Sequence, residues 1–135
     1  MATRKESLLN LRPEVPNAMI YDNMSKDERF QNITLRPVIK LQSELLTEAF
    51  KNYANKHKGV FYTLSLPKKM RYIENAVQKD IKFRNSLKGI IIGQFTVEEF
   101  LAYTDNSSAL NKRMMKIVIE RLKDQLQLLE NESVA

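Results

Sequence analysis

Six Lys and Arg side chains in the middle of the chain have the types and spacing that could do chemistry, namely the binding of anions. These cations are Lys68, Arg71, Lys79, Lys82, Arg84 and Lys88. The first four follow one another at steps of three, eight and three residues, which places them on one outer stripe of a helix. Such a stripe could neutralise phosphates while the nearby Tyr62 and Tyr72 stack on bases. The pattern predicts contact with nucleic acid or another anion, although the solvated face of an ordinary helix carries the same residue types.

The net charge of the chain, +6, is unevenly distributed. Residues 65–94 carry seven basic and two acidic groups, whereas residues 95–135 carry five basic and seven acidic groups. A nucleic-acid partner is therefore expected on residues 65–94 and not on the C-terminal third.

Residue types that serve catalysis and metal binding are scarce. The chain has no cysteine, which excludes disulfides, thiolate catalysis and cysteine metal sites. His57, the only histidine, lies between Lys56 and Lys58, whose positive charges disfavour a bound metal cation. Glu44 and Glu48 share a helix face, but the Glu-x-x-His partners of a di-iron bundle are missing. We therefore predict no catalytic residue, no cofactor and no metal ligand.

The elements that position these side chains are expected to be organised around residues 83–100. This stretch holds the densest apolar run, Ile90 to Ile92, and we expect Ile91 to be buried. The run is followed by the clearest helix start in the chain. There Thr96 and Glu99 have the spacing of a capping box, in which each side chain accepts a hydrogen bond from the other residue's amide.

A long helix is predicted before this stretch, from Leu35 to Lys58. Thr34 is its expected N-cap, and Gly59 suits the left-handed position just beyond its end. Its core-facing stripe is formed by apolar residues at helical spacing, namely Val38, Leu41, Leu45, Ala49 and Tyr53, with Leu46 and Phe50 widening it.

A second helix is predicted after Ser65, which is its expected N-cap. Its inner face would be formed by Leu66, Met70, Ile73, Val77 and Ile81. The sequence leaves open whether this helix runs on to Ile92 or breaks near Asp80, which could cap a new helix.

A short helix from Thr96 to about Tyr103 and a last helix from about Ala109 to Glu130 complete the prediction. The last helix carries a heptad seam of Met115, Ile119, Leu122, Leu126 and Leu129. The seam covers only about two heptads, which favours packing into the chain's own core over a coiled coil. Self-association through the same residues, giving a homodimer, is the other interpretation.

These elements predict an all-α fold, because three glycines and four prolines leave little material for the turns of a strand-rich protein. We expect a single small helical domain of four to six helices at residues 32–135. Residues 1–31 contain Pro13 and Pro16 and show no lasting period, which predicts a flexible N-terminal leader.

The sequence also bears on the chain's surroundings. It contains no uncharged apolar stretch of the length that spans a membrane, and its N-terminus lacks the apolar region of a signal peptide. We therefore expect a cytoplasmic protein with no membrane partner.

The segment from about Phe30 to Leu126 resembles a group of short, uncharacterised, all-helical bacterial proteins. The residues that carry the resemblance are Thr34-Leu35-Arg36-Pro37, Lys58-Gly59-Val60-Phe61-Tyr62, Phe83-Arg84-Asn85 and Leu87-Lys88-Gly89-Ile90-Ile91-Ile92-Gly93. The resemblance implies a shared helical fold and no site residues. Some members carry the automatic label "glyoxalase", but this chain offers neither the strands nor the histidines of the glyoxalase types.

The function expected from the sequence is that of a non-enzymatic helical interaction module, which binds another protein or a second copy of itself. The alternative is a nucleic-acid-binding protein that uses the basic residues 65–94. An enzyme such as a glyoxalase-type lyase is the third and disfavoured interpretation, because acid, base and nucleophile do not converge.

Overall fold

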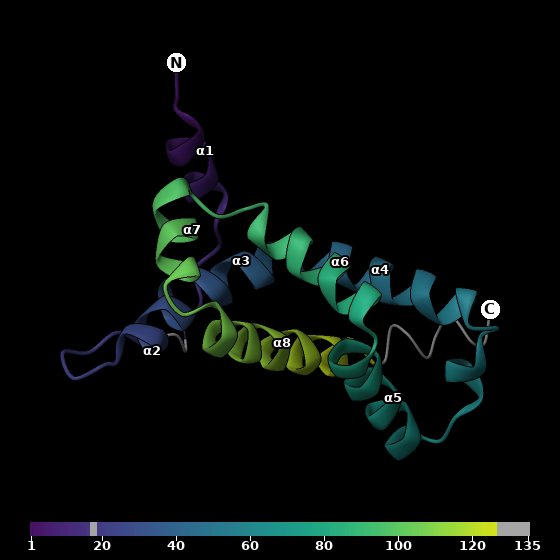
Figure 1. The fold of residues 1–135 in the computed structure, drawn as a ribbon. Coiled ribbons are helices and arrows are strands. Elements are labelled where there is room, and N and C mark those ends of the chain that lie inside the picture. Colours follow the sequence, from purple (N-terminus) through teal and green to yellow (C-terminus); the bar gives the residue numbers. More distant parts are fainter. Residues whose placement is uncertain (17–18, 127–135) are drawn as a thin grey trace. The chain divides into compact units, whose positions relative to one another are not determined.

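The computed structural model describes residues 1–16 and 19–126, and every regular element in this part of the chain is a helix. In chain order these elements are α1 (Arg4–Leu11), α2 (Lys26–Phe30), η1 (Gln31–Leu35), α3 (Arg36–Leu41), α4 (Ser43–Lys56), η2 (Val60–Thr63), α5 (Leu66–Lys79), α6 (Ile81–Ile92), α7 (Val97–Thr104) and α8 (Ser107–Asp124) (Figure 1). The element η1 is a π-helix and η2 is a 3₁₀ helix. The all-α class predicted from the sequence is confirmed.

The helices belong to two compact units. The first unit comprises residues 1–42 and 88–114, and the second comprises residues 43–87 and 115–135. Buried side chains of the first unit include Leu35, Val38, Ile39, Ile91, Phe95, Leu110 and Met114. Those of the second include Leu46, Phe50, Phe61, Ile73, Val77, Leu87 and Leu122.

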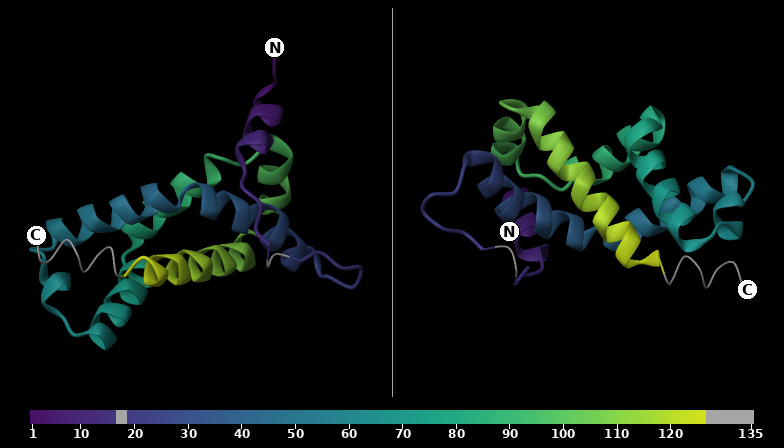
Figure 2. Two further views of the ribbon diagram at one scale, coloured as in Figure 1. Left: turned by 180° about the vertical axis from the view of Figure 1, so that it is seen from behind. Right: turned by 90° about the horizontal axis from the view of Figure 1, so that it is seen from below.

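The number of helices exceeds the predicted four to six. The described residues form eight α-helices, or seven if the uninterrupted run from Lys26 to Leu41 counts as one. Figure 2 shows these helices from two further sides. Two of the additional helices, α1 and α2, lie within residues 1–31. Thr3 caps α1 and Ser25 caps α2, each accepting a hydrogen bond from an amide three residues later. Whether residues 1–31 are flexible stays a prediction.

The predicted helix from Leu35 to Lys58 is wrong at both its start and its middle. Thr34 does not cap it, because the helical run begins at Lys26 and Thr34 lies inside η1. At Gln42 the backbone leaves the helical conformation (φ −91°, ψ 5°), and α4 begins afresh. The break shifts the buried face by one residue, so Leu45 is 52% exposed while Leu46 is buried.

The second predicted helix does break at Asp80, which was one of the two alternatives. The Asp80 carboxylate Oδ1 accepts a hydrogen bond from the Phe83 amide at 3.2 Å, which caps α6. The chain turns at this point between α5 and α6 (Figure 1). Because of this turn Ile81 does not continue the inner face of α5 and is 71% exposed.

The inner face predicted for α5 is correct at Ile73 and Val77 but wrong at Leu66 and Met70, which are 48% and 37% exposed. The buried position is taken by Lys69, whose ammonium group lies 5.5 Å from the centre of the Phe61 ring. A cation over an aromatic face retains part of the electrostatic stabilisation that it loses on leaving water.

The last helix carries the predicted seam on its buried face. Met115, Ile119, Leu122 and Leu126 are all buried, and Leu129 lies outside the described residues. None of the helices in residues 1–16 and 19–126 is long and apolar enough to cross a membrane.

Candidate functional site

The six predicted anion contacts do not all lie in one unit. Lys68, Arg71, Lys79 and Lys82 are exposed, and within the described residues no carboxylate pairs with any of the four. Arg84 is half-buried in the same second unit. Lys88 is half-buried on the same helix as Lys82 and Arg84 but belongs to the first unit, and its contact with an anion stays a prediction.

The face of α5 that carries Lys68, Arg71 and Lys79 is continuous, but Lys82 lies on α6 beyond the break at Asp80, so the prediction that all four share the stripe of one helix is wrong. Lys68, Arg71, Asn75 and Lys79 follow at steps of three, four and four, and all four are exposed. Tyr72 lies beside them and is half-buried. The described parts of the second unit, residues 43–87 and 115–126, contain twelve Lys and Arg and six Asp and Glu.

Three aromatic rings next to this face form a stack that the sequence did not reveal. The ring centres of Phe83 and Tyr53 are 4.3 Å apart, those of Tyr53 and His57 are 4.1 Å apart, and both pairs are close to parallel at 29°. Phe83 is buried, Tyr53 is half-buried and His57 is exposed. The stack therefore leads from the interior of the second unit to its surface.

Asp80 fixes the middle ring of the stack. The Tyr53 hydroxyl donates a hydrogen bond to the Asp80 Oδ2 at 3.0 Å. Burial and the Asp80 carboxylate raise the pKa of Tyr53 to about 12, so the phenol keeps its proton. The amide of Phe83, the Tyr53 hydroxyl and the charge of His57 together lower the pKa of Asp80.

Two hollows border this stack. One, of about 570 Å³, contains Tyr72, Asn75 and Lys79, and the other, of about 440 Å³, contains Lys56 and Lys82. Tyr53, His57 and Asp80 line both hollows. Among the described residues that line the two hollows, Asp80 is the one carboxylate beside three lysines, which leaves this surface suited to an anion.

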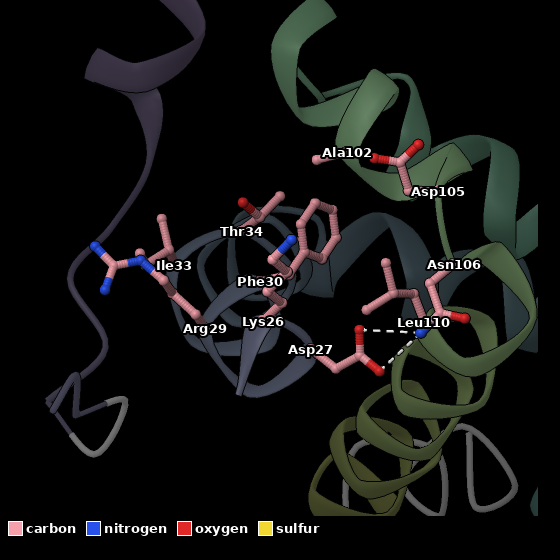
Figure 3. A pocket seen from close by; sticks show the side chains of 10 residues that line it. All are labelled: Lys26, Asp27, Arg29, Phe30, Ile33, Thr34, Ala102, Asp105, Asn106 and Leu110. Atoms are coloured by element: carbon pink, nitrogen blue, oxygen red, sulfur yellow. Dashed lines mark hydrogen bonds between the residues drawn. The ribbon is translucent and has the colours of Figure 1, made fainter. Parts of the chain in front are cut away.

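The first unit has a different kind of surface, an apolar hollow of about 460 Å³ (Figure 3). Phe30, Ile33, Ala102 and Leu110 supply its apolar lining. Its charged and polar residues are Lys26, Asp27, Arg29, Thr34, Asp105 and Asn106. The Asn106 amide donates to both oxygens of Asp27 at 3.0 and 3.2 Å. This contact ties α2 to the start of α8.

A face of α7 beside this hollow is apolar and exposed. Val97, Phe100 and Leu101 share one side of the helix, and they are 65%, 43% and 59% exposed. Ala102 and Asp105 come next around the helix and line the hollow. The sequence carries the signal for this face, which is the spacing of three and four residues directly after the Thr96 cap.

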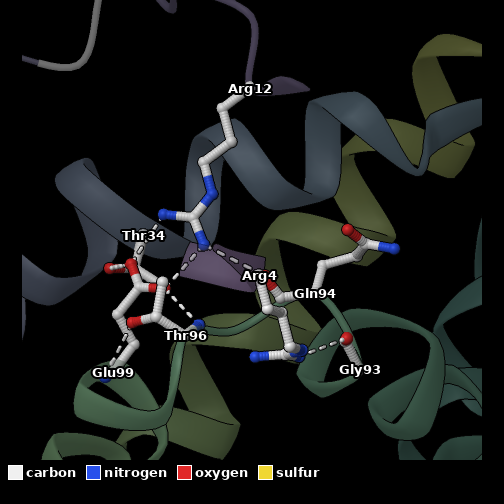
Figure 4. Close-up of polar contacts among 7 residues, drawn as sticks. All are labelled: Arg4, Arg12, Thr34, Gly93, Gln94, Thr96 and Glu99. Carbon is white, nitrogen blue, oxygen red and sulfur yellow. Dashed lines mark hydrogen bonds and ion pairs between the residues drawn. The ribbon is translucent and has the colours of Figure 1, made fainter. Parts of the chain in front are cut away.

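A polar network holds the N-terminal segment on the first unit (Figure 4). The Arg12 guanidinium donates to both carboxylate oxygens of Glu99 at 2.6 Å and to the Gln94 carbonyl at 3.0 Å. Glu99 also accepts bonds from the Thr96 amide at 2.8 Å and the Thr34 hydroxyl at 2.7 Å. The predicted capping box is therefore confirmed and has two further partners.

These contacts decide the charge of Glu99. Burial raises the pKa of its carboxyl, but hydrogen bonds from Arg12, Thr96 and Thr34 and the positive charge of Arg12 lower it further than burial raises it. The net pKa lies below the ordinary glutamate value, so Glu99 is ionised at neutral pH and its pair with Arg12 is a full ion pair.

The described residues contain no group of three His, Cys, Asp or Glu side chains close enough to hold a metal ion. The four described seam residues of α8 are buried, so a homodimer through them would require α8 to expose its inner face; self-association stays a prediction.

Comparison with known proteins found no matching family model, no similar curated protein and no similar solved structure. The resemblance to the short bacterial group therefore stays an expectation, and the function must be argued from the two surfaces themselves.

Proposed function

We propose that this chain is a non-enzymatic helical interaction module that binds an amphipathic helix of another protein on its first unit. The observation that carries the proposal is the exposed apolar face of α7, formed by Val97, Phe100 and Leu101. Three large apolar side chains on one exposed helix face are unfavourable in water, and such patches typically mark a contact with a partner.

The neighbouring hollow supports a helix as the occupant. Its lining of Phe30, Ile33, Ala102 and Leu110 could accept one large apolar side chain, while α7 packs against the next turn of the same partner helix. The partner would thus present apolar residues three and four positions apart, which is the pattern of an amphipathic helix.

The charges around the hollow indicate what flanks those apolar residues. Lys26 and Arg29 belong to α2, and Asp105 follows α7. No ion pair within the described residues satisfies any of the three. A complementary helix would carry an acidic residue toward α2 and a basic residue toward Asp105, which would favour one orientation of binding.

The π-helix η1 also supports a binding role for the hollow. It supplies Ile33 and Thr34 to the hollow, and Thr34 in turn donates to Glu99. A π-turn within an α-helical run is rare and is found frequently at functional sites.

Site-specific photo-crosslinking tests the proposal. A photoreactive residue at Leu101 or at Ile33 should crosslink to the same protein in native lysate, and the crosslinked peptide should show apolar residues at helical spacing. A photoreactive residue at Val60, which is 48% exposed in the second unit, is the matched control and should not capture that protein.

Two outcomes would overturn the proposal. Crosslinks from Leu101 to a second copy of this chain, with a dimer mass in light scattering that Leu101→Asp reduces to the monomer, would make the occupant the chain itself. Equal capture from Val60 would show that no specific surface is present.

A further inference from the structure

The basic surface of the second unit is independent of the proposed protein contact, and its open end is the His57 ring. Tyr53 stacks against both Phe83 and His57 at little more than 4 Å. Two near-parallel rings at these distances would overlap if they lay on the same face of Tyr53. Phe83 and His57 therefore cover opposite faces, and the outer face of His57 is turned to solvent.

The His57 ring is held in place for an incoming aromatic group. Its Nδ1 lies 2.8 Å from the Tyr53 carbonyl oxygen, which can only accept, so Nδ1 donates this bond. The bond and the stacking on Tyr53 fix the ring, and little side-chain entropy would be lost when a further ring stacks on it.

Cations stand on both sides of this open ring. Lys79 lines one neighbouring hollow, and Lys56 and Lys82 line the other. Arg71 and Lys68 continue from Lys79 along the exposed face of α5. A chain of phosphates that crosses His57 would therefore meet positive charge before and after the stacked ring.

We infer that this surface binds single-stranded nucleic acid, with one base stacked on the outer face of His57. The phosphates beside that base contact Lys79 on one side and Lys56 and Lys82 on the other. The strand then follows Arg71 and Lys68 along α5.

The ring stack favours a single strand over the other polyanions. Duplex DNA keeps its bases stacked on each other, so it would offer phosphates to the lysines but no ring to His57. An acidic peptide supplies carboxylates but no planar base. Only an unpaired nucleotide uses both the lysines and the ring.

The absence of tryptophan from the chain allows a direct test. In His57→Trp the new indole is the only one, so its fluorescence reports what stacks on this position. A short oligothymidine at low salt should quench the emission and bind with a measurable Kd. Val97→Trp, an exposed site in the first unit, is the matched control and should show no quenching.

Two further variants separate stacking from charge. His57→Ala should weaken oligonucleotide binding about tenfold, because one base–aromatic stack is lost, while His57→Phe should bind close to the unchanged chain. With Lys68, Arg71, Lys79 and Lys82 as contacts, log K should fall with log salt at a slope of about −3. Changing these four to Gln should flatten the slope, whereas changing Lys112 and Lys116, which are exposed on α8, should not.

The inference would be overturned by absence of binding at low salt or by equal quenching in Val97→Trp. Duplex DNA or polyglutamate that binds as tightly as the single strand, with His57→Ala unaffected, would show a surface for anions in general and not a nucleic-acid site. Circular dichroism of each variant keeps unfolding apart from loss of binding.

Discussion

Arg12 and Glu99 form a bidentate, largely buried ion pair in the first unit. Their side chains are only 7% and 15% exposed, and both oxygens of the carboxylate are satisfied. The loss of hydration of two buried charges is offset here by a bidentate pair and by three further hydrogen bonds. Removal of one partner leaves the other charged and desolvated, which is much more costly than loss of an exposed pair.

Glu99→Gln should therefore destabilise the chain at neutral pH by about 3 kcal/mol, which urea unfolding can measure. The folded pKa of Glu99 lies below its unfolded value, so its contribution is present above the ordinary value of 4.5 and is lost as the pH falls through the folded pKa. The difference in the free energy of unfolding between Glu99→Gln and the unchanged chain should accordingly be smaller at pH 3 than at neutral pH.

Glu98 provides the control, because its pair with Lys5 at 3.4 Å is exposed on both sides. Glu98→Gln should leave the unfolding midpoint unchanged within error. Equal effects of the two substitutions would mean that Arg12 does not hold Glu99 in solution.

Ile91 is the residue on which the predicted apolar centre depends, and it is fully buried. Ile91→Asp should unfold the chain or cause aggregation, because a buried unpaired carboxylate costs several kcal/mol, comparable to the stability of a whole domain. Thermal melting followed by circular dichroism is the measurement. Ile81→Asp on the same helix, at a position 71% exposed, should have nearly the same melting temperature as the unchanged chain. An unchanged melting temperature for Ile91→Asp would show that this residue is not buried in solution.

Residue-level prediction from the sequence succeeded where the partners are near in the chain. Thr96 and Glu99 were predicted to pair because three residues separate the ends of a capping box. The contribution of Arg12 to the same site could not be predicted, since 87 residues separate it from Glu99 and a surface arginine has no local signature. For the same reason the stack of Phe83 on Tyr53 was missed, although Tyr53 and His57 are only four residues apart at the end of α4.

At the scale of the elements, Asp80 decides where one helix ends and the next begins. It accepts from the Phe83 amide and the Tyr53 hydroxyl, so it caps α6 and anchors the ring stack together. Asp80→Ala should lower the melting temperature by a few degrees, because one cap bond and one side-chain bond are lost. Asp80→Asn keeps an acceptor for the Phe83 amide, so its melting temperature should lie between those of Asp80→Ala and the unchanged chain. An unchanged melting temperature for Asp80→Ala would show that the break between α5 and α6 does not need the cap.

The breaks also explain which elements were predictable. The helices after residue 31 were predictable from the apolar period and the caps, and α7 was placed within one residue because its cap is strong, whereas α1 and α2 were not predicted. The break at Gln42 has no proline or glycine in the sequence to mark it, so α4 was assigned the wrong phase. On α5 the buried position that hydrophobicity alone had assigned to Met70 is likewise taken by Lys69, whose ammonium group lies 5.5 Å from the centre of the Phe61 ring.

At the scale of the whole molecule, the two units carry two different chemistries. The first exposes an apolar helix face and an apolar hollow, and the second is rich in basic residues, three of which, Lys56, Lys79 and Lys82, line the hollows beside the ring stack. Charge counting along the sequence had located the basic surface, but the apolar face of α7 was hidden among residues expected to be core. We therefore propose that protein binding and nucleic-acid binding belong to separate parts of one chain.

Recovery of the tagged chain from native lysate, with and without nuclease, tests this assignment most directly. The unchanged chain is compared with Leu101→Asp, which alters the α7 face, and with the fourfold Gln variant at Lys68, Arg71, Lys79 and Lys82. A protein partner should survive nuclease, stay with the fourfold variant and be lost in Leu101→Asp. Nucleic acid should be lost in the fourfold variant and stay with Leu101→Asp. A protein partner that disappears with nuclease, or that Leu101→Asp retains in full, would contradict the proposed function.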